Sequence, residues 1–94
     1  MLIRSQDKKN LVNINTINGL GIGEYGTYNI YALINSGQYL LGKYSTEENA
    51  VRVLDMIEEV YSKPVVCDVF SDNEKFIYSN QMFHMPQEDE VELL

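Results

Sequence analysis

The segment from Leu40 to Tyr61 constrains the fold more than any other part of this chain, because a strand pattern runs directly into a one-sided helix. Ser45 lies three residues before Glu48, the spacing of a capping box, in which each side chain accepts a hydrogen bond from a backbone N–H at the helix start. The pattern predicts a helix from about Thr46 to Ser62, closed by Pro64. Its apolar residues recur at intervals of three and four: Ala50, Val53, Leu54, Ile57, Val60 and Tyr61.

Strand patterns lie on both sides of this helix. Thr27–Ile34 and Tyr39–Tyr44 flank a turn that contains Gly37, and they predict an antiparallel hairpin. The other expected strands are Leu2–Arg4, Leu11–Ile17, Val65–Phe70 and Lys75–Tyr78. We therefore predict an α+β fold with a single antiparallel β-sheet of about five strands and one helix packed on it. Because both faces of Thr27–Ile34 are apolar, a strongly curled or barrel-like sheet is the alternative.

The length of 94 residues predicts one small domain, because a chain of this size buries only about 60–65% of its unfolded surface on folding. We expect residues 1–86 to form this α+β domain and residues 87–94, four of them acidic, to form a solvated C-terminal tail. We find no secretory signal and no apolar run of the ~18–20 residues that a membrane span requires. Because the lone Cys67 cannot form an intrachain disulfide, we expect a cytoplasmic protein.

The net charge of −7 is distributed unevenly. Residues 1–46 hold four basic against two acidic residues, whereas residues 47–94 hold three basic against twelve acidic ones. Proteins that grip nucleic acid through its phosphates need a basic surface, so we expect no direct nucleic-acid binding. An acidic surface instead attracts a protein partner that carries a basic surface. On the helix itself, Glu48 and Arg52 have the spacing of a weak ion pair.

The glycine-rich segment Asn18–Gly26 contains a G-x-G-x-x-G pattern from Gly21 to Gly26. A dinucleotide site needs a helix after the third glycine, but the residues that follow here alternate like a strand. We therefore predict a loop that joins two strands. A loop that closes over a small nucleotide, so that the protein sequesters the ligand, is the alternative function for this segment.

His84 and Cys67 are the only residues of their types. Zinc requires three or four nitrogen, sulfur or oxygen ligands, and no Cys–His spacing in the chain supplies them, so we expect no metal and no cofactor. A Cys–His nucleophile pair is the alternative from the enzyme class, although no third group is evident that would orient the base. The chain contains no other nucleophile with a base and no phosphate loop in its proper setting, so we predict that it is not an enzyme.

The chain contains seven tyrosines and no tryptophan, and this is the one feature of its composition that bears on function. Tyrosine offers a large contact area together with a hydroxyl that tolerates exposure, and for that reason it is enriched at interfaces. The alternative is that the tyrosines fill the faces of the sheet, and the apolar residues before the acidic segment pose the same choice. The predicted interaction surface consists of Tyr25, Tyr28, Tyr31, Met82, Phe83 and Met85.

Four stretches match a pattern shared by other proteins. They are Ile3–Lys8 (IRSQDK), Leu41–Glu48 (LGKYSTEE), Val53–Ile57 (VLDMI) and Phe83–Val91 (FHMPQEDEV). With these stretches the chain resembles a family of short, uncharacterised proteins of Gram-positive bacteria, their prophages and other mobile elements. The resemblance implies a small α+β domain and a mobile-element context. It carries no catalytic residues.

Together these features favour a non-catalytic protein-binding module. In the context that the resemblance implies, the module would be an accessory or inhibitory factor that acts on a host protein. A defence protein whose basic groove normally holds nucleic acid is one such target. Self-association as a homodimer through an exposed strand edge is the alternative that requires no other partner.

Overall fold

The structure is a computed structural model that describes residues 1–62, 65–68, 75–78 and 82–92. For residues 65–68 and 75–78 the description covers the backbone and its pairing. The strands are β1 (Leu2–Arg4), β2 (Leu11–Asn13), β3 (Gly19–Tyr25), β4 (Thr27–Ile34), β5 (Gly37–Tyr44), β6 (Val65–Asp68), β7 (Lys75–Tyr78) and β8 (Met82–His84). The helices are the 3-10 turn η1 (Ile14–Thr16), the long α1 (Glu47–Tyr61) and the short α2 (Glu88–Glu92).

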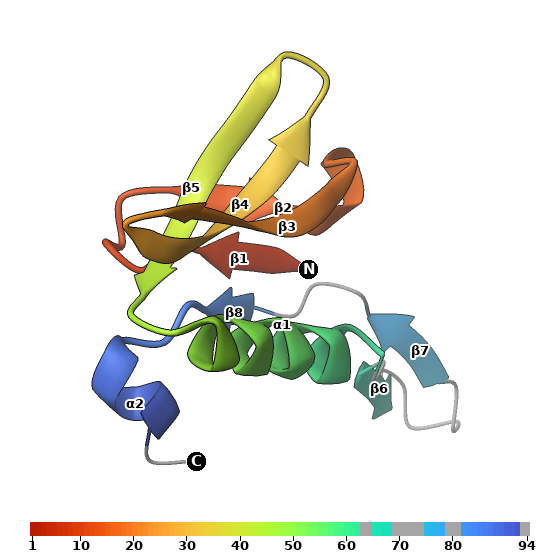
Figure 1. Cartoon of the computed structure of the whole chain (residues 1–94). Helices are drawn as coiled ribbons and strands as arrows, with labels where there is room; N and C mark the ends of the chain where they lie inside the picture. Colours follow the sequence, from red (N-terminus) through yellow and green to blue (C-terminus); the bar gives the residue numbers. More distant parts are fainter. Residues whose placement is uncertain (63–64, 69–74, 79–81, 93–94) are drawn as a thin grey trace.

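The strands form two three-stranded sheets and a separate β6–β7 hairpin (Figure 1). Sheet A has the order β2-β1-β8, and sheet B has the order β3-β4-β5. The predicted α+β class is thus confirmed, and a hairpin does join Val65–Asp68 to Lys75–Tyr78. The prediction of a single five-stranded antiparallel sheet was wrong, because β8 pairs in parallel with β1. The barrel-like alternative was also wrong, because sheet A and sheet B do not close on one another.

Sheet A brings together residues that are distant in the sequence. Ile3 at the centre of β1 lies opposite Val12 on the antiparallel strand β2 and opposite Phe83 on the parallel strand β8. Ile3 and Phe83 are buried in the core, and Val12 packs against it. Because strand side chains alternate, the neighbours of these residues, among them Arg4 and Met82, lie on the outer face of the sheet.

Sheet B covers the core from the other side. Ile30 and Ala32 on the central strand β4 are fully buried, and the register of β4 with β5 shifts between Ile30 and Tyr31. At this bulge Gly42 is the partner of Ile30 and Leu40 is the partner of Tyr31, so Leu41 is the extra residue. The core between the sheets and α1 contains Met1, Ile3, Ile30, Ala32, Leu41, Tyr44, Ala50, Val53, Ile57, Phe83, Met85 and Val91.

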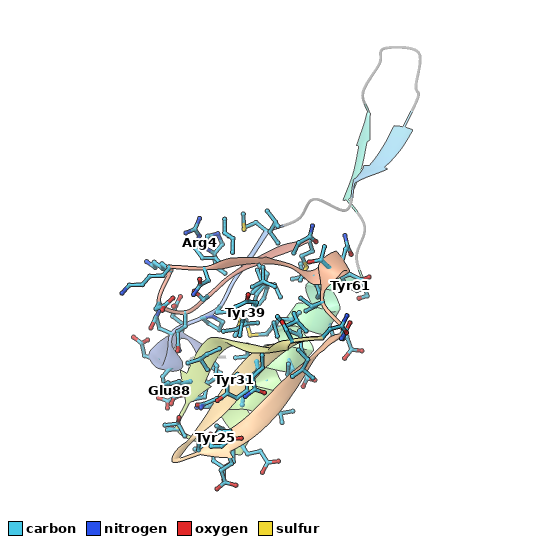
Figure 2. The ribbon with its side chains drawn as sticks, turned by 90° about the horizontal axis from the view of Figure 1, so that it is seen from above. Arg4, Tyr25, Tyr31, Tyr39, Tyr61 and Glu88 are labelled. Atoms are coloured by element: carbon cyan, nitrogen blue, oxygen red, sulfur yellow. The ribbon has the colours of Figure 1, made fainter. Side chains whose placement is uncertain are left out.

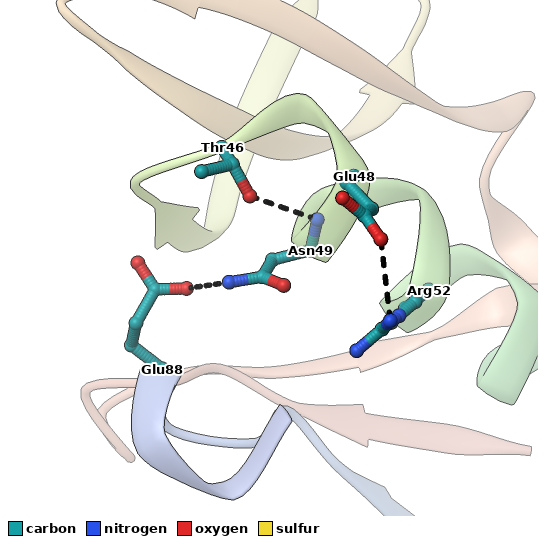
Figure 3. A network of polar contacts seen from close by, with 5 residues as sticks. All are labelled: Thr46, Glu48, Asn49, Arg52 and Glu88. Atoms are coloured by element: carbon teal, nitrogen blue, oxygen red, sulfur yellow. Dashed lines mark hydrogen bonds and ion pairs between the residues drawn. The ribbon is translucent and has the colours of Figure 1, made fainter. Parts of the chain in front are cut away.

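Helix α1 begins one residue later than the capping-box spacing predicts. The N-cap is Thr46, whose Oγ1 accepts a hydrogen bond from the backbone N–H of Asn49 at 3.1 Å, as Figure 3 shows. Ser45 therefore does not cap the helix. Its own N–H donates to a carboxylate oxygen of Glu88. The predicted ion pair is confirmed, since Nη2 of Arg52 lies 3.2 Å from Oε1 of Glu48.

The buried face of α1 agrees with the predicted apolar stripe over most of its length. Ala50, Val53 and Ile57 are buried, and Leu54 and Val60 pack against the core. Tyr61 is exposed, because it lies in the last turn of the helix. None of the helices among the described residues combines the length and the apolar character needed to cross a membrane.

Two segments differ from their predicted structure. The glycine-rich segment predicted as a loop contains the seven-residue strand β3, and only Gly26 in the turn after it has a positive φ, of 76°. The strand predicted over Leu11–Ile17 ends at Asn13. The side chain of Asn13 accepts a hydrogen bond from the N–H of Asn15 at 3.0 Å and thereby starts η1.

The segment predicted as a solvated acidic tail is partly in contact with the domain. Residues 88–92 form α2, in which Val91 is fully buried. Glu88 accepts hydrogen bonds from the Ser45 N–H and from Nδ2 of Asn49, the latter at 2.9 Å (Figure 3). The helix dipole favours a negative charge at the N-terminus of α1. The position of α2 places the carboxylate of Glu88 there.

Candidate interaction surface

The outer face of sheet B carries an apolar surface that we call the glycine–tyrosine face. Strand alternation and the register place its residues on the side of the sheet opposite Ile30 and Ala32. They are Gly19, Gly21, Gly23 and Tyr25 on β3, Tyr31 and Leu33 on β4, and Leu40 on β5. Tyr25 is 70% exposed, and Leu33 and Leu40 are each 38% exposed. The face is therefore open to contact.

The glycines of β3 allow the tyrosine rings to lie against the backbone. A Cβ atom at Gly23 would lie 3.0 Å from Cε2 of both Tyr25 and Tyr31. These two rings meet edge to face, with their centroids 6.3 Å apart and an interplanar angle of 86°. This geometry is favourable for aromatic pairs. The alternation of glycines in β3 thus makes room for an aromatic pair on the surface.

Polar contacts fix one ring of this pair. Asn29 is buried beside the rings, accepts a hydrogen bond from Oγ1 of Thr27, and donates from Nδ2 to the hydroxyl of Tyr31 at 3.1 Å. The hydroxyl of Tyr31 is therefore held at a defined position. A surface whose aromatic side chains are already ordered loses less conformational entropy on binding.

Only part of the predicted interaction surface lies together. Tyr25 and Tyr31 belong to the glycine–tyrosine face, whereas Tyr28 lies on the other face of sheet B, opposite Tyr44. The charge of Glu24, then partial burial, then the charge of Glu47 raise the pKa of the Tyr28 hydroxyl. The structure thus places Tyr28 in an acidic setting at the end of the sheet.

The Met82–Met85 segment does not join this surface. Phe83 is 7% and Met85 4% exposed, so both are core residues and the prediction that they form an exposed contact patch was wrong. Their position in and after β8, paired to the buried strand β1, accounts for this burial. Met82 is exposed, but it lies on the outer face of sheet A with Arg4. Figure 2 shows Arg4 and Tyr25 on opposite sides of the main body of the molecule.

Three of the four stretches that carry the family resemblance meet at one junction. The N–H of Gln6 donates to the carbonyl of Leu41 at 2.7 Å, and its Oε1 accepts from the N–H of Lys43 at 2.8 Å. Nε2 of Gln6 also donates to the carbonyls of Lys43 and Pro86, each at 3.2 Å. Gln87 completes the junction, since its Nε2 donates to the carbonyl of Gln6 at 2.8 Å.

These contacts give the junction a structural role. Gln6 occupies the free edge of β5 and makes the hydrogen bonds that a neighbouring strand would otherwise make. The Gln6 side chain thereby satisfies backbone groups of Lys43 and Pro86. A depression of about 300 Å³ beside it is lined by Gln6, Asp7 and Leu40–Lys43.

The residues considered for catalysis or metal binding do not form a site in the described part of the chain. His84 is exposed on β8, next to a depression of about 440 Å³ that Lys8, Gln87 and Glu90 also line. The side chain of Cys67 lies outside the described residues. The alternative of a Cys–His pair with His84 is therefore not tested by the structure. No group of three or more His, Cys, Asp or Glu side chains among the described residues is arranged to hold a metal ion.

The sequence offered one signal for the glycine–tyrosine face that the predictions did not use. Gly19, Gly21 and Gly23 recur with a period of two, which is typical of a strand with one empty face. Leu40 was missed for a different reason, because β5 begins at Gly37 and not at Tyr39 as predicted, and this register places Leu40 opposite Tyr31. Comparison with protein families, with curated proteins and with solved structures found no match to the chain.

Proposed function

We propose that the chain is a non-catalytic protein-binding module and that the glycine–tyrosine face is its contact surface. The observation that carries the proposal is the ordered pair of Tyr25 and Tyr31 beside the exposed Leu33 and Leu40. Aromatic residues in the centre of a surface with apolar neighbours are typical of protein interfaces. Isolated apolar residues on a surface need no such explanation, but a contiguous group does.

The partner carries basic groups around its own apolar contact. The chain has a net charge of −7, and acidic residues, among them Glu24 and Glu47, lie near the end of sheet B that carries Tyr25. Charge complementarity of this kind accelerates association and weakens as salt screens it. A basic groove that otherwise holds nucleic acid fits this description.

The biological setting of the proposal comes from the family resemblance. The module acts in the cytoplasm as an accessory or inhibitory factor of a mobile element, and its target is a host protein. The alternative, a small-nucleotide-sequestering module, has less support, since Gly19–Tyr25 forms the strand β3 where a glycine loop was predicted.

A capture experiment with matched variants tests this proposal. The double variant Tyr25→Ser with Leu33→Ser removes two exposed residues of the face. The control, Tyr61→Ser with Val51→Ser, removes two exposed residues of comparable size from α1. Tagged forms of each are used to capture proteins from a Gram-positive host lysate at low and at high salt.

The expected result is a protein that wild type and the α1 control retain and the face variant loses. Its recovery should fall as salt rises, and nucleic acid should compete with it. A protein that all three forms retain equally would contradict the assignment of this face. No retained protein at any salt concentration would contradict the function itself.

A further inference from the structure

We propose that the chain forms a symmetric homodimer in which β3 of one copy pairs antiparallel with β3 of a second copy, around a twofold axis at Ile22. The pairing joins the two copies of sheet B into one six-stranded sheet. The inference concerns self-association and needs no other partner, so it is tested separately from the proposed function, with which it shares Tyr25.

The edge of sheet B formed by β3 is open. Among the described residues β3 pairs with β4 alone, and Figure 2 shows it at the margin of the sheet. Edge strands are usually protected by a lysine, a proline or a bulge. Residues 19–25 contain no lysine and no proline, their one charged residue, Glu24, lies next to the end of the strand, and their register with β4 runs unbroken from Gly19 to Tyr25. This edge thus offers seven residues of backbone for strand addition.

The opposite edge of the same sheet differs, because it is covered at Leu41 and Lys43. There the backbone of β5 at Leu41 and Lys43 is bonded by Gln6, whose side chain imitates a neighbouring strand. The fold therefore protects one edge of sheet B with a specific residue and leaves the other edge without such a device.

The apolar interior is also less well covered at the β3 edge. Ile30 and Ala32 on β4 are fully buried, whereas Ile22 and Leu20, which lie directly opposite them on β3, are only partly buried. A second strand beside β3 would cover the exposed part of these two side chains. Burial of apolar area is the main favourable contribution to association.

Strand geometry selects one register for the pairing. Outer-face residues must lie opposite outer-face residues, and the antiparallel register that uses all seven residues places Ile22 opposite Ile22 of the partner subunit. It also places Tyr25 opposite Gly19 of the partner subunit. An aromatic side chain over a cross-strand glycine is favourable, and Gly23 within one chain already lies beneath two tyrosine rings.

The net charge opposes this dimer and thereby gives it a distinctive salt dependence. Each copy carries −7, so raising the salt concentration screens the repulsion and strengthens the dimer. Binding to a basic partner responds to salt in the opposite direction. The two Glu24 side chains lie about 14 Å apart in the proposed register, beyond the Debye length of ~8–10 Å, so they do not prevent the pairing.

Sedimentation equilibrium of the full chain tests whether it dimerises through the β3 edge. We expect a monomer–dimer equilibrium between about 1 μM and about 1 mM protein that shifts toward dimer between about 50 mM and about 500 mM NaCl. Gly21→Lys should weaken the dimer by about tenfold or more, because it places two lysines diagonally across the axis. A Cβ at this position makes only an ordinary contact, 3.5 Å from Leu33 Cδ1, so Gly21→Ala should fold and remain dimeric.

Ser36→Lys is the matched control for Gly21→Lys. It makes the same change in net charge in the turn between β4 and β5, outside the strand that pairs, and it should leave the dimer unchanged. A chain that is monomeric throughout these ranges would overturn the proposal. A dimer that Gly21→Lys leaves intact would overturn the assignment to β3.

A disulfide experiment tests the register. In a Cys67→Ser background, Ile22→Cys should form an intermolecular disulfide under mild oxidation, because the residue on the axis faces its own copy within bonding distance. Ser36→Cys in the same background should not form one. If the dimer persists and Ser36→Cys forms a disulfide as readily as Ile22→Cys, the antiparallel pairing around Ile22 is wrong.

Discussion

The hydroxyl of Tyr44 donates a hydrogen bond to the backbone carbonyl of Pro86 at 2.8 Å, and so ties the end of β5 to the segment between β8 and α2. Tyr44 is almost completely buried. Burial, followed by the charges of Glu88 and Glu90, raises the pKa of this hydroxyl well above its ordinary value. The hydroxyl therefore remains a neutral donor over the whole physiological pH range.

Tyr44→Phe should lower the free energy of unfolding by about 1 kcal/mol, as expected for the loss of one buried hydrogen bond. The loss stays small because Nε2 of Gln6 also donates to the Pro86 carbonyl, which is therefore not left unsatisfied. Combining Tyr44→Phe with Gln6→Leu should cost more than the sum of the single variants. Urea denaturation measures all three, and strict additivity would argue against a shared acceptor.

Glu88→Gln should lower stability by about 0.5–1 kcal/mol at neutral pH, because the partly exposed charge-assisted hydrogen bonds from Ser45 and Asn49 are weakened. Burial raises the pKa of this carboxyl, but the hydrogen bonds from Ser45 and Asn49 outweigh it and hold the pKa below the value of 4.5 expected for a free Glu. The contribution is therefore fully present above that value and is lost as the pH falls through the lower folded pKa.

The pH dependence separates this effect from a simple change in net charge. The stability difference between wild type and Glu88→Gln should shrink as the pH falls below about 4.5. Glu92→Gln removes the same charge from an exposed position of α2 and serves as the control. A difference from wild type that grows toward acid pH would contradict the assigned contacts.

Gly23→Ala should destabilise the protein by about 1–3 kcal/mol, because the added methyl group would meet the rings of Tyr25 and Tyr31 at 3.0 Å. Gly19→Ala lies on the same face of the same strand with no atom within 4 Å, and it should be neutral or slightly stabilising. Thermal unfolding followed by circular dichroism compares the two. Equal effects would show that the rings do not lie over Gly23.

Ile57→Ala should cost about 2–5 kcal/mol, because Ile57 is buried in the core beneath the two sheets. Val51→Ala on the exposed side of α1 should cost less than about 1 kcal/mol. Denaturant titration of both variants checks which face of α1 is inward. A larger loss for Val51→Ala would mean that the helix is rotated from the position described.

The local features of the fold were predictable from the sequence because they depend on neighbouring residues. The buried stripe of α1, the β4–β5 hairpin and the Glu48–Arg52 pair all follow from spacings within a few positions. The predicted N-cap lay one residue too early, because Ser45 and Thr46 are both residue types that cap helices well. The hydrogen bond that the Ser45 N–H donates to Glu88 depends on a residue far away in the sequence. The parallel pairing of β1 with β8 has no local signal at all.

The same distinction applies to the candidate surface. Tyr25 and Tyr31 were predicted from composition and are neighbours on sheet B. Phe83 and Met85 were assigned to the surface because an apolar segment beside acidic residues can be either exposed or buried. The partner strand decided between these outcomes, and β1 lies about 80 residues away in the sequence.

During protein synthesis β1 is made long before β8, because the strands of sheet B and helix α1 lie between them in the sequence. The three consecutive strands of sheet B and the adjoining helix can form from short-range contacts while the chain is still growing. The apolar side chains of Ile3 and Val12 remain incompletely covered during this time, because β8, which brings Phe83 beside Ile3, has not yet been synthesised. Sheet A is therefore completed only shortly before α2, and a nascent chain halted before residue 82 would expose an unfinished core to chaperones and proteases.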